Sequence, residues 1–150
     1  RLKWANHDRR MRSDDKLSPS PSFFDACMTH RYPEPMGSSL QKIDQFDFHA
    51  TLADMTGPTL VMFTAPDCGS CRHLRGVLRQ VSAREPGWQV FEVDAQRDPG
   101  LAHEFEVFHL PTVFLFQNGE FHCQLDAEAR TSAIISATRR ALLQPPGEAP

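Results

Sequence analysis

One stretch of the sequence decides the fold of this chain: Thr59-Leu-Val-Met-Phe-Thr-Ala-Pro-Asp-Cys-Gly-Ser-Cys71. Its first part, residues 59–64, is a short apolar run, which is typical of a strand covered on both faces. The loop Ala65-Pro66-Asp67 follows this run. Beyond the second cysteine, apolar residues recur at helical spacing: Leu74, Val77, Leu78 and Val81. The stretch therefore predicts a buried strand, a tight turn and a helix over residues 69–83.

Two cysteines separated by two residues lie where this strand gives way to the helix. A helix N-terminus offers unpaired N–H groups and the positive end of the helix dipole, and both stabilise a thiolate. We therefore expect Cys68 to have a lowered pKa and to act as a nucleophile. Cys71 lies in the first turn, where it can attack a mixed disulfide formed by Cys68. Gly69 and Ser70 allow the tight turn and leave little bulk over Cys68, so the expected reaction is thiol–disulfide exchange.

The same cysteine spacing also occurs in zinc sites and in pairs of inert buried cysteines. A zinc site of this type needs a second pair of ligands. The other candidates offer no second C-x-x-C pair at the usual distances: Cys27, His30, His73 and Cys123. The position of the pair between a strand and a helix favours redox chemistry over inert burial. The sequence therefore predicts neither a metal nor an organic cofactor.

On either side of this stretch, strands and helices are expected to alternate. The expected strands are residues 40–43, 59–64, 88–93, 111–116 and 121–125, and the expected helices are 46–55, 69–83, 99–105 and 127–143. Asp98 and Asp126 are candidate caps of the last two helices, and Pro99 suits a first helical position. Asn118-Gly119 indicates a two-residue hairpin. Strands joined through helices pair in parallel, so we predict an α/β domain with a mixed central sheet and helices on both faces.

The composition is that of one folded domain. A length of 150 residues suits a single domain, and 40% hydrophobic residues are enough for a core. Four cysteines are too few for a scaffold held together by disulfides. The net charge of −3 argues against a dedicated nucleic-acid binder. No apolar run approaches the ~20 residues that a membrane helix needs.

The prolines divide the chain into a compact centre and irregular ends. They cluster in the first quarter and at the last residues: Pro19, Pro21, Pro33, Pro35, Pro145, Pro146 and Pro150. We expect a largely irregular N-terminal extension with a short helix over residues 1–38, a compact domain over 39–144 and a loose tail over 145–150. A cytoplasmic location is favoured, and a signal segment upstream of Arg1 would instead place the protein in the periplasm.

Further motifs follow the cysteines in a fixed order. His109-Leu110-Pro111-Thr112 stands at the start of an expected strand. A proline is tolerated at a strand start because it has no N–H to donate to the hydrogen bonds of the sheet. The stretches that carry a family likeness are residues 59–71, Val93-Asp94 with Asp98-Pro99, Phe105 to Thr112, and Val113 to Glu120. On these motifs the chain resembles the thioredoxin family over about residues 39–143. The resemblance implies the thioredoxin fold and a thiol–disulfide oxidoreductase.

The resemblance also implies how substrates would bind. It implies a cis Leu110–Pro111 bond that faces the two cysteines, with the Leu110 backbone pairing with an extended substrate strand and Pro111 shielding the thiols. The substrate groove is expected to comprise Leu110, Pro111, Asp67, Gly69, Ser70 and His109. The implied partners are disulfide-containing proteins and an upstream thiol reductase, and a monomer is favoured. The leading hypothesis is reduction of protein disulfides by a Cys68–Cys71 dithiol cycle.

The chain departs from the pattern of the family around the cysteines. The departures are Met62 for a usual buried aspartate, Val90 for a lysine, Asp67 and Thr64 for tryptophans, and Ser70 for a proline. Proton transfer at Cys71 must therefore use water or another group. A carboxylate beside Cys68 also disfavours its thiolate and opposes the helix dipole.

These departures motivate other hypotheses. A partner-binding or chaperone-like module would keep the motif and lose efficient turnover, as Met62, Val90 and Asp67 and the phenylalanine-bearing N-terminal extension suggest. A periplasmic thiol relay would depend on residues upstream of Arg1. Two cysteines stand outside the motif: we expect Cys123 to be buried in the last strand and Cys27 to be a free thiol in the N-terminal extension.

Overall fold

The computed structural model describes residues 40–150, and the expected N-terminal helix and Cys27 lie outside this range. The element order is the predicted β-α-β-α-β-α-β-β-α. The strands are β1 (Gln41–Lys42), β2 (Pro58–Thr64), β3 (Gln89–Asp94), β4 (Thr112–Gln117) and β5 (Glu120–Gln124). The helices are α1 (Phe48–Ala53), α2 (Gly69–Arg84), α3 (Pro99–Glu104) and α4 (Thr131–Ala141). The predicted boundaries at residues 38 and 144 stay predictions.

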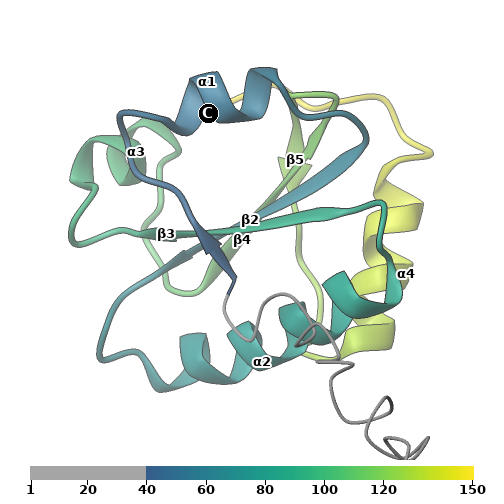
Figure 1. The fold of residues 1–150 in the computed structure, drawn as a ribbon, viewed down its shortest axis with the longest axis horizontal. Coiled ribbons are helices and arrows are strands. Elements are labelled where there is room, and N and C mark those ends of the chain that lie inside the picture. Colours follow the sequence, from purple (N-terminus) through teal and green to yellow (C-terminus); the bar gives the residue numbers. More distant parts are fainter. Residues whose placement is uncertain (1–39) are drawn as a thin grey trace, which may run out of the picture. The chain divides into compact units, whose positions relative to one another are not determined.

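The five strands form one mixed sheet in the order β1-β3-β2-β4-β5. β3 lies in the centre of a parallel trio with β1 and β2. β4 runs antiparallel to β2, and β5 antiparallel to β4. Helices α1 and α3 cover one face and α2 and α4 the other, as Figure 1 shows with α1 above and α2 below the strands. The predicted mixed sheet with helices on both faces is confirmed.

Alternation along β2 divides its side chains between two hydrophobic cores, since successive strand residues point to opposite faces. Leu60 and Met62 belong to the core under α2 and α4. Val61 and Phe63 belong to the core under α1 and α3. This second core is aromatic, with neighbouring ring centroids 5.3–6.3 Å apart among Phe48, Phe63, Phe105, Phe114, Phe116 and Phe121. Because both faces are buried, β2 is held rigidly and fixes the loop that leads to the cysteines.

The prediction that α4 begins at residue 127 with Asp126 as its cap is wrong. The helix begins at Thr131, and Arg130 takes the cap position without a side-chain hydrogen bond. The residues between β5 and the helix are used in tertiary contacts: Ala127 and Ala129 pack against the core under α2. The Leu125 N–H donates to the Val113 carbonyl at 2.8 Å, so the residue after β5 still pairs with β4. Packing therefore overrides the helical pattern here.

Two other helix ends also differ from the prediction. Asp98 does hold the cap position of α3, but its side chain makes no capping bond. Its Oδ1 instead accepts the Gln45 N–H at 3.2 Å, which ties α3 to the loop before α1. α1 begins only at Phe48, because the Asp44 carboxylate accepts the Phe46 and Asp47 N–H groups in a turn of its own. A polar side chain near a helix start can accept either the free N–H groups of the helix or N–H groups of a neighbouring turn or loop, and tertiary contacts decide between them.

The predicted hairpin between β4 and β5 is confirmed at Asn118 and Gly119. Both residues have positive φ, at 53° and 84°, as a type I′ turn requires. The Asn118 Oδ1 accepts the Gly57 N–H at 2.8 Å and so joins the hairpin to the start of β2. After α4, the Gly147 N–H donates to the His122 carbonyl at 2.7 Å. None of the helices within residues 40–150 is long and apolar enough to cross a membrane.

Candidate active site

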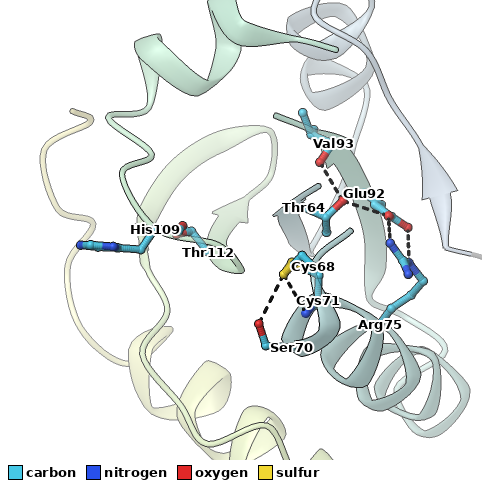
Figure 2. Close-up of a disulfide and its surroundings, with 9 residues drawn as sticks. All are labelled: Thr64, Cys68, Ser70, Cys71, Arg75, Glu92, Val93, His109 and Thr112. Atoms are coloured by element: carbon cyan, nitrogen blue, oxygen red, sulfur yellow. Dashed lines mark hydrogen bonds and ion pairs between the residues drawn. A yellow bond between two sulfur atoms is a disulfide. The ribbon is translucent and has the colours of Figure 1, made fainter. Parts of the chain in front are cut away.

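Cys68 and Cys71 form a disulfide at the N-terminus of α2, with their Cα atoms 5.2 Å apart. Cys68 is itself the N-cap residue of the helix, and its Sγ accepts the Cys71 N–H at 3.1 Å. The Ser70 hydroxyl lies 3.3 Å from the same sulfur (Figure 2). Cys68 is partly exposed, whereas Cys71 is completely buried. The two sulfurs therefore differ in access, and Cys68 is the one that a partner can reach.

The Leu110–Pro111 peptide bond is cis, as the family resemblance implies. It precedes β4, where the Thr112 hydroxyl donates to the His109 carbonyl at 2.5 Å and closes the turn. Pro111 and Ser70 line one cavity of about 310 Å³ beside the disulfide. The segment that carries the cis bond and the cysteine motif, forty residues apart in the chain, are thus brought to one place by the β2–β4 pairing.

This cavity is formed by three parts of the fold. Its walls are Ser70, His73 and Leu74 of α2, Pro111–Val113 at the start of β4, and Gln124–Ala127, Ala129 and Ile134 from β5 to α4. Much of this lining is apolar, with His73 and Asp126 as its ionisable members. The His73 side chain is exposed, and its Nε2 lies 3.2 Å from the Ala129 carbonyl oxygen. The late start of α4 is what leaves Asp126 and Ala127 available to line the cavity.

The other residues predicted for a substrate groove do not line this cavity. Asp67 and Gly69 are exposed on the loop beside Cys68. The His109 side chain is exposed and points away from the disulfide in Figure 2. Leu110 is partly buried and packs against the core under α1 and α3. Their predicted contacts with a substrate stay predictions.

Cys123 lies in β5, as predicted, but it is only half-buried. Burial raises the pKa of its thiol. This thiol therefore resembles a packing residue more than a reactive cysteine.

A buried polar cluster next to the disulfide is absent from the sequence-based prediction. Glu92 of β3 is 5% exposed, and its carboxylate accepts two bonds from the Arg75 guanidinium, at 2.9 Å from Nε and 2.5 Å from Nη2. The Thr64 hydroxyl lies 3.0 Å from Glu92 Oε1 and 3.3 Å from the Val93 carbonyl oxygen. Figure 2 shows this cluster on one side of the cysteines and His109 on the other.

Two signals in the sequence point to this cluster in retrospect. Glu92 interrupts the apolar run of residues 90–93, so the buried part of the strand contains a carboxylate. Arg75 follows Cys71 by four residues and therefore lies on the same face of the helix. A buried carboxylate needs a partner, and of the arginines on α2 it is Arg75, one turn after Cys71, that binds Glu92.

The pKa of Glu92 is lowered in the folded protein. Burial alone would raise the pKa, but hydrogen bonds from Arg75 and Thr64, with attraction to Arg75 and Lys42, outweigh it. The hydrogen bond to Glu92 likewise raises the pKa of Arg75. The pair is therefore ionised in the folded state at neutral pH.

This lowered pKa predicts an acid-dependent loss of stability. The stabilisation from ionised Glu92 is fully present above its ordinary pKa of 4.5 and is lost as the pH falls through the lower folded-state value. Urea unfolding from pH 7 to pH 3 should therefore show the stability difference between wild type and Glu92→Gln shrinking below about pH 4.5. A difference that stays constant over this range would contradict the prediction.

Within residues 40–150 there is no group of three or more His, Cys, Asp or Glu side chains placed to hold a metal ion. The chemistry that this region offers lies in the sulfur pair, the helix N-terminus and the cis bond. Together with the strand order, these features define a thioredoxin-fold domain with a candidate redox site at the start of α2.

Comparison with known proteins agrees with this class. Residues 39–140 match the family model described as Thioredoxin. Chloroplastic thioredoxin Y1 of Arabidopsis thaliana is 31% identical over 113 residues, which are 75% of this chain and 62% of that protein. Thioredoxin of Chlamydia trachomatis is 32% identical over 81 residues, which are 54% of this chain and 78% of that protein. This chain belongs to the thioredoxin family.

The solved structures show the same fold. Oxidised mitochondrial thioredoxin 3 of Saccharomyces cerevisiae has a TM-score of 0.60 to this chain at 20% sequence identity. The match covers 67% of this chain and 94% of that one. At this identity the likeness concerns the fold alone.

Proposed function

We propose that this protein reduces disulfide bonds in other proteins through a Cys68–Cys71 dithiol cycle. The observation that carries the proposal is the unequal access of the two sulfurs, with Cys68 partly exposed at the helix N-terminus and Cys71 buried behind it. Such an arrangement assigns attack to one cysteine and resolution to the other.

The cycle is balanced in atoms and electrons. The Cys68 thiolate attacks one sulfur of a substrate disulfide; the S–S bond of the substrate breaks, and its other sulfur leaves as a thiolate that takes up a proton. The Cys71 thiol then loses its proton and attacks Cys68 Sγ, which releases the second substrate thiol. The substrate gains two electrons and two protons, and the Cys68–Cys71 disulfide is left. An upstream thiol reductase must then reduce this disulfide.

Two features support the attacking role of Cys68. The Cys71 N–H points at Cys68 Sγ in the oxidised form, and the same donor can stabilise negative charge on that sulfur in the reduced form. The N-terminus of α2 adds the positive end of a 16-residue helix. Both effects act before a substrate arrives and so favour the thiolate in the resting reduced protein.

The cavity beside the disulfide supports docking of a polypeptide. An extended substrate segment pairing with the Leu110 backbone would carry one side chain toward the cavity bordered by Ser70 and Pro111. The apolar walls favour an apolar side chain next to the substrate cysteine. The monomeric state, the identity of the reductase and the cytoplasmic location stay predictions.

Trapping of the intermediate tests the proposal. Cys71→Ser, incubated with an oxidised substrate such as insulin, is expected to accumulate a mixed disulfide through Cys68, because no resolving thiol remains. Non-reducing electrophoresis and mass spectrometry would detect the adduct. The Cys68→Ser/Cys71→Ser double variant is the control and should form no adduct at this site. An adduct that forms through Cys27 or Cys123 instead would overturn the assignment.

A further inference from the structure

We propose that the Arg75–Glu92 ion pair, in which the carboxylate is buried and the guanidinium is partly exposed, is a positioning pair for the redox site, which sets the acidity of the buried Cys71 thiol in the reduced protein. The inference rests on the proposed function only in taking Cys71 as the resolving cysteine. Its content is specific: the positive charge of Arg75 and the negative charge of Glu92 act on the Cys71 thiol with opposite signs.

The first argument is the shared location of the pair and the thiol. Cys71 and Arg75 are four residues apart on α2, so their side chains lie on one face of the helix, one turn apart. Cys71 has no exposed surface, which places it between the helix and the sheet. Figure 2 shows Arg75 reaching from α2 to the sheet directly after the cysteine turn.

The second argument is the direction of Glu92. Glu92 on β3 is paired with Met62 on β2 in the parallel register. Two residues earlier, Val90 on β3 is paired with Leu60 on β2, and both of these belong to the core under α2 and α4. Because side chains alternate along a strand, Glu92 points to the same face as Val90 and Met62. The Thr64 hydroxyl reaches its carboxylate from the last residue of β2. Cys71, Arg75, Glu92 and Thr64 therefore all lie between the first half of α2 and the sheet.

The third argument is the low polarity around the pair. The side chains that continue this layer are apolar: Leu60, Met62, Leu74, Val77, Leu78 and Val90. The side chain of Arg75 is 24% exposed and that of Glu92 is 6% exposed. On this side the Glu92 carboxylate is shielded from water, while the Arg75 guanidinium reaches the partly exposed edge of the layer, so the pair is screened less than a surface pair and more than a fully buried one.

The structure gives the sign of each effect. Removal of the Glu92 carboxylate would leave the Arg75 guanidinium without a counter-charge, and an unpaired cation favours the Cys71 thiolate. Removal of the Arg75 guanidinium would leave a buried carboxylate, and an unpaired anion disfavours the thiolate. A pair that only braces α2 against β3 would not produce opposite signs.

Other charged groups surround the same region and are left unchanged by these substitutions. Lys42, Asp44, Asp94, Arg97 and Asp98 line a cavity of about 350 Å³ together with Thr64, Arg75 and Glu92. On the exposed side, Asp67, His73 and His109 lie on the cysteine loop, on α2 and before the cis bond. These groups are the same in wild type and in the variants. A difference in the pKa of Cys71 between wild type and a variant therefore reports on the Arg75–Glu92 pair.

The test is a titration of the reduced full-length protein with ¹³Cβ-labelled cysteine, followed by NMR. We expect Glu92→Gln to lower the pKa of Cys71 and Arg75→Met to raise it, each by about one unit, which is roughly a tenfold change in thiolate fraction. The reduction potential, measured against glutathione, should rise in Glu92→Gln and fall in Arg75→Met, because thiolate stabilisation favours the reduced form. Arg75→Lys keeps the positive charge and should lie close to wild type.

A matched control exists at the other end of α2. Arg139 Nη2 of α4 lies 2.7 Å from Oε1 of Glu85, the residue that ends α2, so Glu85→Gln and Arg139→Met change the same charges far from the cysteines. Neither is expected to move the pKa of Cys71. Cys123 titrates in the same spectra and is an internal control on β5.

Shifts of the same sign in Glu92→Gln and Arg75→Met, or shifts below about 0.3 units, would overturn the inference. If Arg75→Met does not fold, the Glu92→Gln/Arg75→Met double variant decides, because it lacks both charges. A downward shift in Glu92→Gln that disappears in the double variant supports the inference, and any other pattern contradicts it. The titration needs no substrate, so failure to reduce insulin would count against the proposed function and leave this result standing.

Discussion

Replacing Cys68 by serine is expected to abolish the catalysed reduction of disulfides, so that only the background rate of the added reductant remains. A serine hydroxyl is not ionised at neutral pH and cannot form the mixed disulfide that carries the reaction. The new side chain would still cap α2, since serine is a preferred N-cap residue. The loss should therefore occur without loss of the fold.

The measurement is the rate of insulin reduction with dithiothreitol as electron donor, together with circular dichroism to verify folding. Cys123→Ser is the control, because Cys123 is half-buried on β5 and its pKa is raised by burial. It should keep wild-type turnover. Turnover retained by Cys68→Ser would overturn the proposed function. A wild type no faster than Cys68→Ser would favour the partner-binding hypothesis that Met62 and Val90 motivate.

Replacing Gly119 by alanine is expected to destabilise the protein by about 3 kcal/mol, the sum of a backbone cost and a steric cost. Gly119 has φ of 84°, where an alanine costs about 1–2 kcal/mol. A Cβ atom at this position would also lie 2.5 Å from the Leu52 carbonyl oxygen and 3.2 Å from the Ala53 Cα. These are backbone atoms of α1, which cannot rotate away as a side chain can, so crowding adds about 1–3 kcal/mol.

Urea unfolding measures this loss, and Gly76→Ala is its matched control. A Cβ atom at Gly76 meets nothing within 4 Å, and the residue lies inside α2. Alanine there should stabilise the protein by up to about 1 kcal/mol, because it is the better helix former. Equal effects of the two substitutions would contradict the contact between the hairpin and α1.

Most of the fold could be predicted from the sequence because its signals are local. The strand β2, the turn at the cysteines and the helix α2 follow from periodicity over a few residues, and Asn118-Gly119 alone indicates the hairpin. The cysteine pair at a helix N-terminus and the proline before β4 could be predicted in the same way. In each case the neighbouring residues in the chain carry the physical reason.

The errors in prediction lie where distant residues compete for the same groups. Asp98 carries the sequence signal of a helix cap, yet its carboxylate binds the Gln45 N–H, 53 residues away. The segment before Thr131 has a helical pattern, yet Ala127 and Ala129 pack against the core instead. The hydrophobic periodicity of the sequence cannot predict these contacts, because they depend on which elements the sheet brings together.

By itself, the sequence determined the class of fold and the position of the Cys68–Cys71 pair through residues adjacent in the chain, and the family resemblance of its motifs implied the cis Leu110–Pro111 bond. Only the tertiary structure decided what surrounds that pair. The β2–β4 pairing brings Pro111 to the cavity that Ser70 also lines. The β2–β3 register turns Glu92 toward α2, where Arg75 meets it one turn after Cys71. A buried charge must be paired to persist, and its partner is chosen by packing in three dimensions.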